Sequence, residues 1–71
     1  MMFVLRIGGS NDFVSRIDPN DRTCSPPGSI DTVSGWGNPK ALQFTSEAKA
    51  QVAALQVEEI EGCHTLVEEV R

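Results

Sequence analysis

The fold is decided by residues 41–62, whose sequence is ALQFTSEAKAQVAALQVEEIEG. The first part, Ala41–Phe44, suits a short strand or extended segment. Thr45 or Ser46 can then accept a hydrogen bond from an N–H group of the first helical turn, and Glu47 lies favourably near the positive end of the helix dipole. We therefore predict an extended segment followed by a capped helix, against which the rest of the chain packs.

This helix is expected to run from about Ser46 to Glu61, with Gly62 as a left-handed stop. Its alanines raise helix propensity and allow close approach to a sheet. Residues 57–60 also suit a strand, so an end near Gln56 is the alternative, and we favour the longer helix. The polar side carries Glu47, Gln51 and Glu58, while Ala48, Val52, Ala53, Leu55, Val57 and Ile60 occupy the rest of the circumference.

Two strands are expected before the first proline. They are Met2–Ile7, an apolar run, and Asp12–Asp18, and a glycine-containing turn joins them. In the second strand we expect Phe13 and Ile17 to face the core together, because residues four apart share a face. The turn includes Gly8–Ser10, which invites comparison with a phosphate-binding turn. Since no helix follows it, a plain hairpin turn is the better interpretation.

Residues 19–38 are rich in Pro, Gly, Ser and Asp and predict a long loop, crossed by a short strand at about Ile30–Val33. Trp36 lies in this stretch between two glycines. Its indole either covers one end of the core, which is the ordinary role, or acts as a contact anchor, because Trp is enriched in interface hot spots.

The segment Cys63–Arg71 predicts a last strand, because its apolar and polar residues alternate and its glutamates discourage edge-to-edge pairing. Together the elements predict one small α+β domain over residues 1–71, a mostly antiparallel sheet with one amphipathic helix on one face, in the order β-β-(β)-α-β. A chain of 71 residues buries only about 60% of its surface on folding, which leaves little room for a deep catalytic pocket.

Charge and cysteine content limit the class of protein. The formal net charge of −4 argues against direct binding of nucleic acid or attachment to anionic membranes, since both need clustered Lys and Arg. No run approaches the ~20 apolar residues of a membrane span, and Met1–Ile7 is not a secretory signal. Two cysteines, Cys24 and Cys63, are fewer than a small secreted scaffold usually carries. We therefore expect a cytoplasmic protein with reduced thiols.

The chain offers little for catalysis or metal binding. His64 is the single histidine, and on a strand it points away from the neighbouring Cys63, so the two do not form a chelating or nucleophilic pair. Cys24 adds at most a third ligand, without C-x-x-C spacing. No cofactor is predicted. A small metal- or thiol-dependent protein using these three residues is the least favoured alternative.

Three stretches resemble small uncharacterised phage and prophage proteins: FVLRIGG at 3–9, GWGNPKALQFTSEAKAQVAAL at 35–55 and LVEEV at 66–70. In that group a first strand leads into a glycine turn, and a tryptophan precedes an A-x-x-F-[ST] segment followed by further alanines. Some such proteins, including anti-CRISPR-type inhibitors, occupy a surface of a host defence protein. The resemblance implies a phage-encoded inhibitor or modulator of a host protein, present in the host cytoplasm.

From these features we expect a non-enzymatic protein-binding module. The candidate partner-binding residues are Trp36, Glu47, Glu58 and Glu61. Acidic residues concentrate in the last third of the sequence, where they form either a solvated face or a contact patch for a basic partner. The main alternative is a self-associating accessory protein, a homodimer in which edge strands pair.

Overall fold

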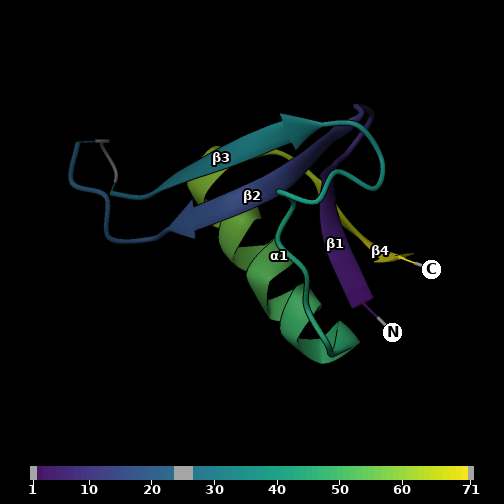
Figure 1. The fold of residues 1–71 in the computed structure, drawn as a ribbon. Coiled ribbons are helices and arrows are strands. Elements are labelled where there is room, and N and C mark those ends of the chain that lie inside the picture. Colours follow the sequence, from purple (N-terminus) through teal and green to yellow (C-terminus); the bar gives the residue numbers. More distant parts are fainter. Residues whose placement is uncertain (1, 24–26, 71) are drawn as a thin grey trace.

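The computed structural model describes residues 2–23 and 27–70 and has four strands and one helix (Figure 1). The elements are β1 (Met2–Ile7), β2 (Asp12–Asp18), β3 (Ser29–Ser34), α1 (Glu47–Glu61) and β4 (Thr65–Val70). This arrangement confirms the predicted α+β class, with the order β-β-β-α-β. The last strand is shorter than the predicted segment 63–71, since it begins at Thr65.

The sheet is antiparallel throughout, with strand order β3-β2-β1-β4. β1 is paired with β4 along its whole length, from Met2 opposite Val70 to Ile7 opposite Thr65. β2 pairs with β3 in the same way, but β1 and β2 are joined at one position, Arg6 opposite Phe13. β4 and β3 are therefore the two edges of the sheet.

Segment 41–44 fills the space where β1 and β2 diverge. The N–H of Leu42 donates to the carbonyl of Val14 (2.9 Å), and Phe44 exchanges hydrogen bonds with Phe3 (2.8 and 2.9 Å). Leu42 and Phe44 pack on the side of the helix, whereas Ala41 is buried on the opposite side of the sheet. The extended segment predicted before the helix thus completes the sheet and brings the chain from one face to the other.

The main core lies between the sheet and α1, where small side chains let the helix approach closely. The buried members of this core are Leu5, Val14, Ala50, Ala53, Ala54 and Val57. The helix begins after Ser46, whose hydroxyl accepts a hydrogen bond from the N–H of Lys49 (3.4 Å). It ends at Gly62, which has a φ of 70° and donates its N–H to the carbonyl of Glu58 (2.7 Å). The longer of the two predicted helices is confirmed.

A second, smaller cluster covers the opposite face of the sheet. Val4, Phe13 and Ala41 are buried there, with Val33 and Val70 packed against them. The loop that follows β3 covers this cluster, and the Trp36 ring lies 5.6 Å from the Phe13 ring at an angle of 59°. Because both faces carry apolar residues, neighbouring residues of one strand are buried on opposite sides.

One prediction about β2 is wrong. Phe13 and Ile17 do not share a face, because a β-bulge between Val14 and Arg16 shifts the alternation by one residue. Val14 and Ile17 therefore pack toward α1, and Phe13 packs in the second cluster. Val14 is fully buried on the helix side.

The stretch 19–38 is not one continuous loop, because it contains β3, one residue longer at each end than the strand expected at 30–33. The carboxylate of Asp21 organises the connection before this strand. It accepts hydrogen bonds from the N–H (2.9 Å) and hydroxyl (2.6 Å) of Thr23 and from the hydroxyl of Ser29 (2.7 Å). The carbonyl of Asp21 accepts the N–H of Gly28 (2.9 Å). The hydrogen bonds from Thr23 and Ser29 to the carboxylate lower the pKa of Asp21 from 3.8 to about 2.

We predict that Asp21→Asn removes part of the pH dependence of stability. A carboxyl whose pKa is lowered on folding stabilises the native state above its unfolded pKa of 3.8, and this contribution is lost as pH falls through about 2. The stability difference between wild type and variant should thus be constant above about pH 5 and shrink toward pH 2. Urea midpoints measured across this range test the prediction, and a difference that does not change with pH contradicts it.

Candidate protein-binding groove

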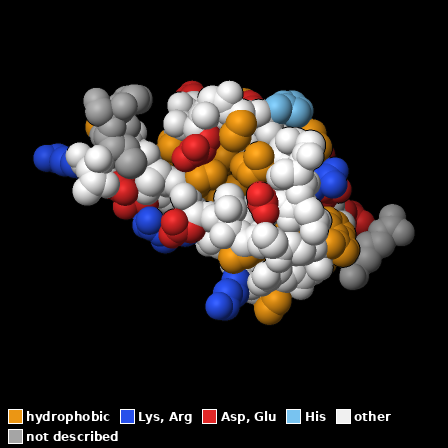
Figure 2. Space-filling view, turned by 90° about the horizontal axis from the view of Figure 1, so that it is seen from above, with side chains coloured by type: hydrophobic (Ala, Val, Ile, Leu, Met, Phe, Trp, Pro, Cys, Tyr) orange, Lys and Arg blue, Asp and Glu red, His pale blue; other side chains and the backbone are white. Residues whose placement is uncertain are grey.

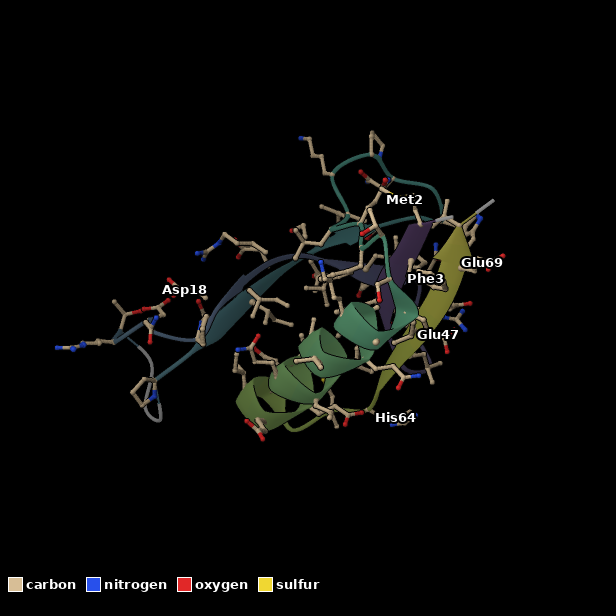
Figure 3. All side chains as sticks on the ribbon, turned by 90° about the horizontal axis from the view of Figure 1, so that it is seen from below. Met2, Phe3, Asp18, Glu47, His64 and Glu69 are labelled. Carbon is tan, nitrogen blue, oxygen red and sulfur yellow. The ribbon has the colours of Figure 1, made fainter. Side chains whose placement is uncertain are left out.

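A groove of about 370 Å³ lies between α1 and the edge strand β4. The helix forms one wall and the first half of β4 forms the other (Figure 3). It is lined by Glu47, Gln51, Ala54, Leu55, Glu58, Thr65, Leu66 and Val67. The five helical residues are spaced three, four or one apart, so they line one side of α1.

The two walls run in opposite directions, because only residues 62–64 connect α1 to β4. Glu58 therefore lies beside the start of β4, where its carboxylate contacts Thr65. Glu47, near the other end of the helix, lines the opposite end of the same groove (Figure 3). The groove consequently has a carboxylate near each end and an apolar middle formed by Ala54, Leu55 and Val67.

Leu55 is the unusual member of this lining, since it is a large apolar residue that is 62% exposed. Val52, three residues earlier, is exposed to a similar extent (68%) but lies outside the groove, on the outer side of the helix. Both belong to the set that was predicted to occupy the apolar circumference of the helix, although the core takes Ala50, Ala53, Ala54 and Val57 instead. The exposed leucine beside an edge strand is an available apolar contact.

The outer edge of β4 presents main-chain groups to this groove. His64 accepts the N–H of Gly8 through its carbonyl (2.8 Å), so the main chain of His64 faces β1. Because main-chain groups alternate in direction along a strand, those of Thr65 and Val67 face outward. The Thr65 N–H is already bound by Glu58 (2.9 Å), which confirms this direction. The carbonyl of Thr65 and the N–H and carbonyl of Val67 point away from β1, toward the open edge of the sheet.

The two groove carboxylates differ in their surroundings. Glu58 Oε2 accepts the Thr65 N–H and lies 3.2 Å from Nδ1 of the exposed His64. Glu47 is exposed, and its Oε1 accepts a hydrogen bond from Gln51 (3.3 Å). Within residues 2–23 and 27–70, neither carboxylate pairs with a Lys or Arg, since the arginine ion pairs found there involve Glu68, Asp18 and Asp31.

The four candidate contact residues do not form one site. Glu47 and Glu58 share the groove. Trp36, 54% exposed, lies on the face opposite the helix, against Phe13. Glu61 lines a separate hollow of about 280 Å³ together with Cys63. On the face seen in Figure 2, apolar side chains also lie next to acidic ones.

Sequence reasoning recognised that Glu47, Gln51 and Glu58 lie on one side of the helix but missed Leu55 and the β4 wall. Leu55 follows Gln51 by four residues and precedes Glu58 by three, which is the signal that could have placed it there. The β4 wall depends on strand order, for which the sequence carries no local signal.

The residues considered for metal or thiol chemistry are only partly described. Cys63 is a half-buried free thiol and His64 is exposed, both in the turn before β4, while Cys24 lies outside the described residues. No group of three or more His, Cys, Asp or Glu side chains suited to a metal ion occurs in the described part of the chain. Within the same residues, no helix has the length and apolar character needed to cross a membrane.

Comparison with protein-family models, with curated proteins and with solved structures found no match to this chain.

Proposed function

We propose that this protein is a non-enzymatic protein-binding module, which binds an extended segment of another protein along the outer edge of β4. The observation that carries the proposal is the combination of an open strand edge with a groove beside it. In strand addition, main-chain hydrogen bonds supply affinity and a neighbouring pocket that accepts alternate side chains supplies specificity. The resemblance to small phage proteins adds that the partner would be a host protein whose activity is inhibited or modulated.

The described main-chain groups support this mode of binding. An added strand would accept a hydrogen bond from the N–H of Val67 and donate hydrogen bonds to the carbonyls of Thr65 and Val67. Its side chains on the helix side would enter the groove and contact Leu55, which is the exposed apolar group there. The wall formed by α1 stands over the edge strand, so such a segment would be held from the side as well as along its main chain.

A second copy of this chain could pair with the same edge. That arrangement is less favoured, because each copy carries a net charge of −4 and acidic residues concentrate along α1 and β4. Light scattering distinguishes the cases. A concentration-dependent doubling of mass that disappears when the β4 edge is altered would support the homodimer instead.

We predict that Leu55→Gln weakens peptide binding without unfolding the protein. The probes are synthetic heptapeptides selected from a random display library on immobilised protein. Burying a leucine side chain contributes about 1.5–3 kcal/mol, so its replacement should weaken binding by about tenfold or more. Val52→Gln is the matched control, since Val52 is exposed to a similar extent but lies outside the groove, and it should leave affinity unchanged.

The direction of the main-chain bonds provides a second readout in the same experiment. N-methylation of the peptide residues whose N–H groups face β4 should abolish binding, because it removes hydrogen-bond donors. N-methylation of the alternate residues, whose N–H groups point away from β4, should be tolerated. Failure to enrich any peptide over the bare support would overturn the proposal. Equal loss of affinity in Leu55→Gln and Val52→Gln would also overturn it.

A further inference from the structure

The groove also indicates what kind of segment it takes, an inference that rests on the proposed function. We propose that the bound segment is extended and basic, with Lys or Arg at one position, an apolar residue two positions later, and Lys or Arg two positions after that. All three side chains would face α1. The order of charges along the groove, the length of the groove and the alternation of side chains in a strand together select this pattern.

The order of charges is acidic, apolar, acidic. Glu58 lies at one end, Leu55 with Ala54 in the middle, and Glu47 with Gln51 at the other end. A cationic side chain at either end would meet a carboxylate that has no Lys or Arg partner in the described residues. Such complementary charge favours specificity and rapid association. An acidic segment would place like charges together at both ends.

The length of the groove selects the spacing between the two basic residues of the bound segment. Residues 47 and 58 are eleven positions apart on a helix, which corresponds to about 16 Å at 1.5 Å per residue. Positions i and i+4 of a strand lie about 13 Å apart, and long Lys or Arg side chains cover the remaining ~3 Å. Positions i and i+2 span only about 7 Å and positions i and i+6 about 20 Å, so neither fits both carboxylates.

The alternation of side chains along a strand determines which residues of the bound segment face α1. In a strand added to β4, residues i, i+2 and i+4 point to the same side of the extended sheet. On the helix side, the middle residue of this set lies opposite Leu55 and Ala54, and the outer two lie near Glu58 and Glu47. Residues i+1 and i+3 point to the other side and meet no groove wall, so their identity is not selected. The nearly symmetric charge pattern accommodates either chain direction.

The two carboxylates are able to accept these cations. Glu58 is bound through Oε2 to the Thr65 N–H and to His64, and its other oxygen has no partner within the residues that the structure describes. Glu47 is exposed at the start of α1, where its Oε1 accepts a hydrogen bond from the side chain of Gln51. The Cys63 thiol and the Trp36 indole lie outside this groove, whereas the His64 imidazole contacts it only through Oε2 of Glu58.

Two synthetic peptides of identical composition test the inference. The first is Ser-Lys-Thr-Leu-Thr-Lys-Ser, in which both lysines share a face with leucine. The second is Ser-Thr-Lys-Leu-Lys-Thr-Ser, in which the lysines lie on the opposite face. Titrations followed by amide chemical shifts of the isotope-labelled protein report both affinity and location. We expect the first peptide to bind at least about tenfold more tightly, with an advantage that decreases at high salt.

Variants of the protein test which carboxylates bind the lysines of the peptide. Glu47→Gln and Glu58→Gln should each reduce the advantage of the first peptide several-fold, and Glu58→Gln retains an oxygen for the Thr65 N–H. Glu61→Gln is the control, because it removes the same charge from the same helix outside the groove. Equal binding of the two peptides, or equal effects of all three variants, would overturn the inference.

The outcomes separate this inference from the proposed function. If neutral peptides bind as tightly as the first peptide and Leu55→Gln still weakens them, the charge pattern is wrong and strand addition at β4 stands. If neither lysine peptide binds, the inference is overturned, and the display selection decides the fate of the proposed function independently.

Discussion

Leu5→Ala is expected to lower the free energy of unfolding by about 2–5 kcal/mol. Leu5 is fully buried in the central strand β1, between the sheet and the alanine-lined face of α1. Truncation removes its burial and leaves a cavity that the surrounding strands can only partly fill. Small domains commonly have only about 5 kcal/mol of total stability, so a large fraction of the variant should be unfolded at 25 °C.

Urea unfolding followed by far-ultraviolet circular dichroism measures this loss. Val52→Ala is the matched control, because Val52 is 68% exposed and its truncation should change stability by no more than about 0.5 kcal/mol. A loss below about 1 kcal/mol for Leu5→Ala would show that the centre of the sheet is not packed as described.

Gly28→Ala is expected to destabilise the fold by about 1–3 kcal/mol. Gly28 has a φ of 127°, a conformation that residues with a Cβ rarely adopt. A Cβ added there would also lie 2.9 Å from Cγ1 of Ile60, near the end of α1. The substitution would therefore strain the backbone and push the helix away from the start of β3.

Two comparisons separate these causes. Gly9→Ala, at a φ of 77° with no atom within 4 Å of the added Cβ, should show only a backbone cost of about 1 kcal/mol. In a double-mutant cycle, Ile60→Ala should cost less in the Gly28→Ala background than in wild type, because the close contact is already lost there. Additive effects would contradict a direct contact between the two residues.

The helix and its position in the chain could be predicted because local signals agree. Ser46 caps it, alanines favour it and Gly62 ends it. The strand boundaries of β1 and β2 also follow from alternation and from the turns that flank them. The face of Phe13 could not be predicted, because a bulge adds one residue to the alternation and leaves no clear local mark.

The candidate site was only half visible in the sequence. Helical spacing places Glu47 and Glu58 on one side, whereas the facing wall depends on β4 lying at the edge of the sheet beside β1. That pairing joins segments distant in sequence, and period-2 patterns do not specify which strands are neighbours. The same limit explains why the exposure of Val52 and Leu55 could not be predicted. These two residues are exposed because α1 turns its alanines, and not them, toward the sheet.

The pairing of β1 with β4 has a consequence for synthesis in the cell. β1 is the second strand from one edge, yet one of its two neighbours is separated from it by residues 8–64. At about 5–20 residues per second, a ribosome needs roughly 3–12 seconds to make that interval. During this time the nascent chain carries the hydrophobic strand β1 with one side unpaired. The hydrogen bonds between β1 and β4 can form only once residues 65–70 have emerged.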